Sequence, residues 1–205
     1  MFSVGYNERS LTHLLFMARP LSVDKRQTIL EAATRLIAEE GLSASTARIA
    51  KAAGVAEGTI FTYFESKDEL ANQLYLDLKG QLRLAYSDLP CSTDLRESLW
   101  QFWSTYVSWG LAHPAQRQAM AKLKVSDRIS PATRESVAES FQVVSGLLMK
   151  ARSLGALRKQ PPAFVAALMV AMAEATIDSI AAEPKLAKTA CADGFSAFWR
   201  AIATG

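Results

Sequence analysis

Cysteine is nearly missing from this 205-residue chain, which contains only Cys91 and Cys191. Two cysteines so far apart suggest neither a disulfide framework nor a zinc cluster, so a reducing, cytoplasmic setting fits best. Seven prolines and ten glycines are too few for a collagen-like or low-complexity chain. No unbroken apolar run reaches the ~18–20 residues that a membrane-spanning helix needs. These absences leave a globular protein as the expected class.

An excess of one charge is also missing, because 23 Lys and Arg stand against 20 Asp and Glu. The net charge of +3 is mild and by itself says nothing about nucleic acid. Half of the residues are apolar, which is enough for a sizeable core. Signals for strands are nearly absent, since Ala and Leu dominate and apolar residues recur at steps of three and four. We therefore predict an all-α fold.

Caps and breaks divide the chain into nine predicted helices. They cover about 24–41, 46–53, 57–64, 67–87, 94–112, 114–125, 131–153, 163–182 and 184–202. Pro90 marks the break between a small N-terminal domain and a larger C-terminal one. Residues 1–16 are interpreted as an upstream extension or a frayed tail, because the run from Met17 leads straight into the first helix.

Residues 46–64 (TARIAKAAGVAEGTIFTYF) have the pattern of a helix-turn-helix. Gly54 permits the positive backbone angle that ends the first helix, and Ile49 and Ile60 are spaced to touch where the helices cross. Hydroxyls and a small glycine at the start of a helix suit phosphates and base edges. The alternative is a helical hairpin in an ordinary core. If the segment is a helix-turn-helix, the exposed face of its second helix consists of Gly58, Thr59, Phe61, Thr62 and Tyr63.

The turn motif is followed by Tyr63-Phe64 and Ser66-Lys67-Asp68-Glu69-Leu70, a combination far more specific than a bare helix-turn-helix. Together with Ile49-Ala50, Ala53-Gly54-Val55 and Gly58-Thr59-Ile60-Phe61, it resembles the TetR family of one-component bacterial regulators. The resemblance implies a nine-helix architecture with a helix-turn-helix DNA-binding domain over 17–68 and an effector-binding and dimerisation domain over 69–205. The implied partners are a palindromic double-stranded DNA operator, a small-molecule effector and a second copy, joined through the last two helices.

Family roles carried over by position give a set of implied DNA contacts. Phe61 stands where the family often has Tyr, so a hydroxyl contact is missing there, and apolar contact with a thymine methyl remains open to it. The whole set is Lys67, Thr46, Thr59 and Tyr63 at the phosphate backbone, Gly58, Phe61 and Thr62 in the major groove, and Arg48 at either.

Aromatic residues gather in the second half, where Trp100, Trp103 and Tyr106 follow one another at three-residue steps. The resemblance implies a ligand pocket in this domain, and an apolar pocket with a few polar handles fits a small molecule. For each aromatic the alternative is core packing. Glu174 and Asp178, one turn apart, could attract a cationic ligand or simply be capped or exposed. The expected ligand-binding residues are Tyr75, Trp103, Tyr106, Phe164, Met169 and Asp178.

Further segments at 17–20, 54–59, 106–110 and 173–178 are similar to multidrug-sensing repressors of this family. They imply repression of an efflux or drug-response gene, relieved by a bulky, aromatic and often cationic compound. The chain shows no phosphate-binding glycine loop, metal-ligand spacing or nucleophile motif, so we expect no catalytic residue, metal or cofactor. The alternative function is a helical small-molecule carrier or an enzyme that lacks DNA binding.

Overall fold

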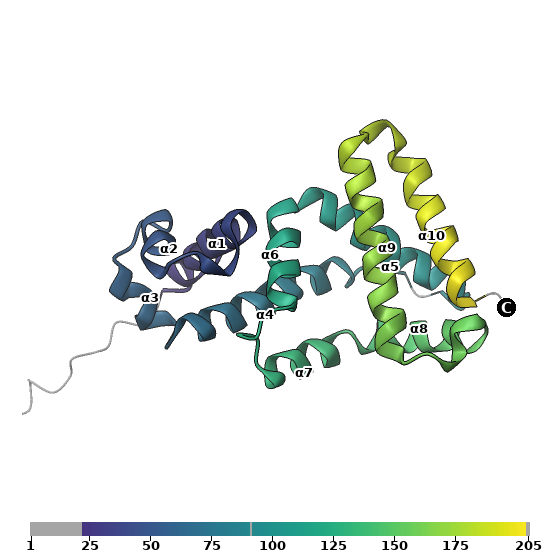
Figure 1. The fold of residues 1–205 in the computed structure, drawn as a ribbon, viewed down its shortest axis with the longest axis horizontal. Helices are drawn as coiled ribbons and strands as arrows, with labels where there is room; N and C mark the ends of the chain where they lie inside the picture. The colour runs from purple at the N-terminus through teal and green to yellow at the C-terminus, as the bar shows by residue number, and fades with distance from the viewer. Residues whose placement is uncertain (1–21, 91, 204–205) are drawn as a thin grey trace, which may run out of the picture.

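The computed structural model describes residues 22–90 and 92–203, which fold into α-helices and short 3-10 helices without a β-strand (Figure 1). The all-α prediction is therefore confirmed over these ranges, and the predicted extension 1–16 lies outside them. The elements are α1 (Val23–Glu40), η1 (Gly41–Ser43), α2 (Thr46–Ala52), α3 (Glu57–Tyr63), α4 (Lys67–Ala85), α5 (Leu95–Ala112), α6 (Pro114–Lys124), α7 (Pro131–Ser140), α8 (Gln142–Ser153), η2 (Ala156–Lys159), α9 (Pro162–Ala182), η3 (Pro184–Leu186) and α10 (Ala187–Ala203).

Most helices begin where their capping residues predict. The hydroxyl of Ser45 accepts a hydrogen bond from the Arg48 amide at 3.2 Å, and Ser66 accepts one from the Glu69 amide at 3.0 Å. Pro114 occupies the first position of α6, where its missing N–H costs nothing. These local devices place the helix starts correctly without any tertiary information.

The single helix predicted over 131–153 is wrong, because the structure divides it into α7 and α8 at Phe141. The amide of Phe141 bonds to the Ala138 carbonyl at 3.2 Å, which interrupts the regular helical ladder. The Phe141 ring lies edge-on against Tyr86, with 6.1 Å between ring centres. A tertiary aromatic contact therefore accompanies a break that the apolar period alone does not reveal.

Helices α1 to α3 form one end of the molecule, and α8 to α10 form the other (Figure 1). The connection is made by α4, whose predicted inward stripe is confirmed by four fully buried leucines, and by α6, which packs along α1 and α4. The Lys122 ammonium on α6 donates to the Ala38 carbonyl of α1 at 2.6 Å. The side chain of Asn72 accepts from the Ser130 amide at 2.9 Å and donates to the Arg128 carbonyl at 2.8 Å. Helix α6 and the loop before α7 thus attach the N-terminal end to the rest of the molecule through α1 and α4.

Helix α9 pairs with α10 (Figure 1) and leaves apolar surface uncovered. Among the described helices it is the one that is long and apolar enough to cross a membrane, by length and composition alone. Only a third of its most apolar 18 residues are buried. Glu174 and Asp178 interrupt its apolar sequence, so it contains no unbroken apolar run of that length. One exposed side of α9 carries mainly small side chains, at Phe164, Ala167, Ala171 and Ala175.

Candidate nucleic-acid interface and ligand cavity

Helices α2 and α3 form the predicted helix-turn-helix. Gly54 in the turn has a φ of 66°, a value that glycine adopts without steric cost. The Val55 amide then donates to the Ala50 carbonyl at 3.0 Å. Ile49 and Ile60 are fully buried, as the crossing of two helices requires. The turn and the crossing fix the direction in which α3 presents its outer face.

The outer face of α3 carries the residues expected to read DNA. The ring of Phe61 is half exposed without a covering element, and Gly58 and Thr62 are exposed beside it. Thr62 donates its hydroxyl to the Gly58 carbonyl at 3.3 Å, whereas Thr59 is half-buried. An exposed aromatic ring between small polar groups is suited to contact with base edges and methyl groups.

Three other expected DNA contacts already have partners within the protein. The Tyr63 hydroxyl accepts from the Ser22 amide at 3.0 Å, which leaves its own hydrogen to donate to a phosphate. Thr46 donates to a Glu57 oxygen at 2.7 Å. Arg48 forms an ion pair with Glu40 across the surface. Thr46 can therefore donate to a phosphate only by leaving Glu57, whereas the exposed guanidinium of Arg48 keeps further N–H donors beside its bond to Glu40.

Lys67 is the first residue of α4 and follows its capping serine. Burial lowers the pKa of its ammonium, nearby Arg128 lowers it further, and Asp68 opposes both effects. Arg128 is paired with Asp68, so a second cation lies at the same helix start. The sequence gives no signal for this, because Arg128 comes from the loop before α7. Helix N-termini with adjacent cations bind phosphate well.

A cavity of 340 Å³ lies among α4 to α9 in the C-terminal part. Tyr75, Tyr106 and Met169 line it, as the resemblance implies. Its other walls are mostly apolar, with basic side chains among them. The further lining residues are Lys79, Leu82, Tyr86, Lys124, Arg134, Val137, Ala138, Phe141, Val144, Ser145, Leu148, Ala166 and Val170.

Two expected walls lie elsewhere. Trp103 is completely buried between α5 and α10, stacked on Phe198 with 5.7 Å between ring centres. Its indole N–H donates to the Cys191 carbonyl at 3.1 Å. Phe164 lies on the outer surface of α9 and is 47% exposed. Placing both at the cavity is therefore corrected, because one is core and the other is surface.

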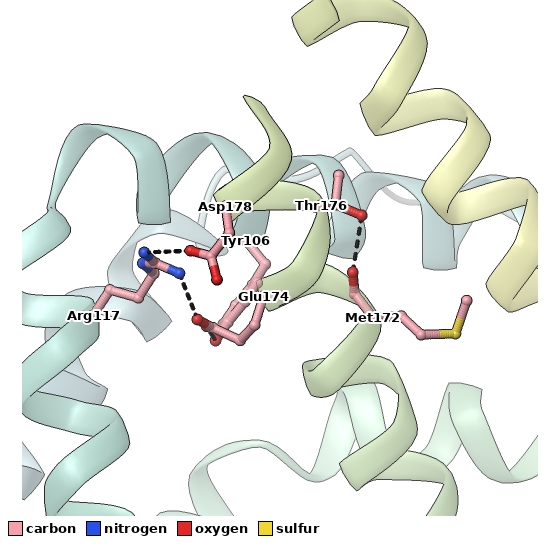
Figure 2. Close-up of polar contacts among 6 residues, drawn as sticks. All are labelled: Tyr106, Arg117, Met172, Glu174, Thr176 and Asp178. Atoms are coloured by element: carbon pink, nitrogen blue, oxygen red, sulfur yellow. Dashed lines mark hydrogen bonds and ion pairs between the residues drawn. The ribbon is translucent and has the colours of Figure 1, made fainter. Parts of the chain in front are cut away.

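Asp178 is also absent from the cavity lining, since it belongs to a polar network between α5, α6 and α9 (Figure 2). Arg117 donates to Glu174 at 2.6 Å and to Asp178 at 2.9 Å. The Tyr106 hydroxyl donates to the other Glu174 oxygen at 2.6 Å. Burial, and then this bond to Glu174, raise the pKa of Tyr106 above its usual range. Both carboxylates thus have a cationic partner within the protein.

The cavity instead contains cations that sequence reasoning missed. Lys79, Lys124 and Arg134 line it, and no carboxylate is among the described lining residues. Burial and then nearby Lys124 lower the pKa of Lys79, Glu174 acts in the opposite direction, and the resulting pKa is about 8. One signal was available, because Lys79 lies one turn after Tyr75 and so on the same face of α4.

Helices α2 and α3 thus form a helix-turn-helix with an exposed aromatic face, next to a helical domain that contains a cavity. Residues 29–74 match the model of the bacterial regulatory proteins of the tetR family. The fatty acid metabolism regulator protein of Bacillus subtilis (strain 168) is 43% identical over 58 residues, which cover 28% of this chain and 30% of that protein. The chain spans about a third of the length of the curated relatives it matches.

Solved structures extend the likeness to nearly the whole fold. A protein from Shewanella sp. PV-4 assigned to the tetR family of transcription regulators has a TM-score of 0.76 at 25% identity, over 86% of this chain and 96% of that one. The regulator FadR of Bacillus subtilis, solved in complex with stearoyl-CoA, has a TM-score of 0.59 at 19% identity, over 83% and 97%. The second comparison concerns the fold alone. The match to the family model thus covers residues 29–74, and the likeness over the rest of the chain is one of fold.

Proposed function

We propose that the protein is a dimeric transcriptional repressor that binds a palindromic DNA operator and releases it when a small molecule fills the cavity. The observation that carries this proposal is the outer face of α3, where the ring of Phe61 is half exposed beside Gly58 and Thr62. A monomer gains nothing from an uncovered ring at that position, whereas the major groove offers thymine methyls to it.

The exposed apolar side chains favour α8 and α9 as the dimer face. Val143 and Met149 of α8 and Phe164 of α9 are 71%, 48% and 47% exposed, and the small side chains on the same side of α9 as Phe164 are exposed as well. Two helices from each copy would form a four-helix interface. The sequence suggested α9 and α10 for this role, but Phe195 and Phe198 of α10 are buried against the protein's own core. A twofold dimer would present two α3 helices to successive major grooves.

Coupling between cavity and DNA follows from shared helices. Tyr75 and Lys79 line the cavity from α4, whose first residue is Lys67 beside the recognition helix. Lys124 lines it from α6, which packs on α1. A ligand that moves α4 or α6 changes the spacing between the two α3 helices of a dimer. A coupling free energy of about 1–3 kcal/mol is usual for such linkage.

The effector that fits these walls is bulky, with an apolar and partly aromatic body. The rings of Tyr75, Tyr86, Tyr106 and Phe141 all line the cavity. Together with the resemblance to multidrug-sensing repressors, these rings lead us to propose an efflux or drug-response gene as the regulated target. The competing function, a helical carrier without DNA binding, predicts no gel shift with the DNA that flanks the protein's own gene.

Replacing one expected phosphate contact and one expected base contact by alanine tests the arrangement of the DNA interface. We expect Lys67→Ala to weaken binding to every DNA sequence alike, and to reduce the salt slope of log K by about 0.9, because a phosphate contact carries no base information. We expect Phe61→Ala to change the preference at one base pair by about 1–3 kcal/mol. Gel shifts with operator variants at several salt concentrations measure both effects.

The matched control is Lys51→Ala, which removes an exposed lysine of α2 that has no implied contact with DNA. Its salt slope should stay that of the parent protein. Uniform weakening by Phe61→Ala together with altered sequence preference in Lys67→Ala would show that the reading face of α3 is assigned wrongly.

A further inference from the structure

The ammonium of Lys79 lies at the cavity without a carboxylate partner. Its Nζ is 5.7 Å from the ring centre of Tyr75 and 5.3 Å from the ring centre of Phe141. Within the described part of the chain, no hydrogen bond or ion pair reaches it. An ammonium held by ring faces alone retains its capacity to donate three hydrogen bonds to an anion.

Two further cations line the same cavity from neighbouring elements. Arg134 of α7 donates to the carbonyls of Lys124 and Ser126, each at 2.8 Å. These acceptors are neutral, so they orient the guanidinium without cancelling its charge. Lys124 adds a second charge from the end of α6. Several like charges beside low-dielectric walls produce a positive potential inside a cavity.

The nearest acidic groups are already bound within the protein. One Glu174 oxygen accepts from Tyr106 and the other from Arg117, each at 2.6 Å. Asp178 is bound by the same Arg117, and its side chain is 67% exposed to solvent. The carboxylates of the network are therefore engaged by the protein, whereas the ammonium of Lys79 has no acidic partner.

We propose that the effector is an anion, with an apolar aromatic or alkyl body and a carboxylate that binds Lys79. The inference rests on the proposed function, because it names the chemical class of the molecule that fills the regulatory cavity. It reverses the charge of the cationic compound that the family resemblance implies. The apolar body would lie against Leu82, Leu148 and Met169, within a volume of 340 Å³.

Probes that share one body and differ only in charge test this directly. 2-Naphthylacetate, 2-(2-naphthyl)ethanol and 2-(2-naphthyl)ethylammonium carry a negative, neutral and positive head on the same ring system. Decanoate and decyltrimethylammonium repeat the comparison with an alkyl body. We expect the carboxylate to bind at least about 10-fold more tightly than the ammonium in at least one pair, as measured by calorimetry without DNA. The pair that responds distinguishes an aromatic from an alkyl body.

The variant Lys79→Met keeps the length of the side chain and removes its charge. We expect it to weaken carboxylate binding about 10- to 100-fold, to leave binding of the neutral alcohol within about threefold, and to raise the Tm of the ligand-free protein. The rise follows because a costly half-buried charge is removed. The control Lys185→Met alters an exposed lysine of η3 and should change neither value. A second variant, Lys124→Met, keeps the test decisive if Lys79→Met fails to fold, and should weaken carboxylate binding about threefold or more.

The pH dependence gives an independent reading. With a pKa of about 8, Lys79 loses its proton between pH 7 and 9.5, so carboxylate binding should weaken over that range in the parent and stay nearly level in Lys79→Met. Burial raises the pKa of the cavity tyrosines, so they keep their protons over most of this range. Six titratable or charged groups surround Lys79. They are Tyr75 of α4, Tyr86 directly after α4, Tyr106 of α5, Lys124 of α6, Arg134 of α7 and Glu174 of α9.

Equal or reversed preference in both probe pairs overturns the inference, as does the absence of binding by both carboxylates. The same is true if carboxylate binding is unchanged in Lys79→Met, or in Lys124→Met where the first variant does not fold. These results are separable from the proposed function. Operator binding without carboxylate binding rejects the effector class and leaves the DNA-binding regulator standing. Carboxylate binding without any gel shift rejects the regulator and leaves the anion site standing.

Discussion

Replacing Ala171 by arginine is expected to produce a folded monomer that no longer binds its operator. Ala171 lies at the middle of α9 on its exposed, small-residue side, so the new side chain disturbs nothing within one chain. In the proposed dimer it would place an unpaired charge between two apolar helices, at a cost of about 2–5 kcal/mol. A monomer contacts only one half-site, and operator affinity should fall by about 100-fold or more. Analytical ultracentrifugation and gel shifts measure the two effects, and far-UV circular dichroism checks the fold.

Two further arginine variants make this prediction specific. Ala121→Arg changes an exposed alanine on α6 and should remain dimeric with normal operator affinity. Ala192→Arg changes an exposed alanine on α10 and distinguishes the two possible dimer interfaces. It disrupts an interface made by the last two helices, α9 and α10, but spares one made by α8 and α9. Dissociation in both Ala171→Arg and Ala192→Arg would assign the interface to α9 and α10.

Replacing Trp103 by alanine is expected to lower the free energy of unfolding by about 3–5 kcal/mol. The indole is completely buried, and its loss removes the stack on Phe198 and the hydrogen bond from the indole to the Cys191 carbonyl. For a chain of this size the Tm should fall by about 6–20 °C. Below that Tm, affinity for a carboxylate probe should remain within about threefold of the parent. Thermal unfolding and calorimetry at low temperature give the two quantities.

The control is Trp100→Ala, which removes a half-buried indole from the same helix. It should cost clearly less stability than Trp103→Ala, because less of its surface is out of water. If Trp103→Ala keeps the parent's Tm and loses the carboxylate probe, Trp103 is a wall of the ligand site, and the cavity is assigned to the wrong side of α5.

Local chemistry explains which parts of the fold could be predicted. Ser45, Ser66 and Pro114 are capping or initiating residues whose effect depends only on their neighbours in sequence, so the helix starts follow from them. The break at Phe141 does not, because the apolar period continues through it and the compensating contact with Tyr86 comes from a distant segment. The sequence therefore predicts where helices begin, but it does not predict that the helix over 131–153 is broken at Phe141.

The same limit applies to the ligand site. Trp103 and Tyr106 are three residues apart on α5, yet Trp103 faces α10 and Tyr106 faces the cavity. Their spacing predicts a shared aromatic face but contains no information about where that face meets its neighbours. Lys79 was missed for a related reason, since a lysine on a helix normally points to solvent and only the placement of α7 and α8 around it encloses it.

Helix α6 sets a condition on exchanging parts between regulators of this fold. The stretch that matches the family model ends at residue 74, and Pro90 offers a natural point at which to join two genes. A chimera joined there would keep Ala38 and lose its partner Lys122, and it would keep Asn72 and lose Ser130. The segments that have to be transferred together are therefore not contiguous in the gene. A transferred helix-turn-helix domain needs the residues of α6 and of the following loop against which it packs.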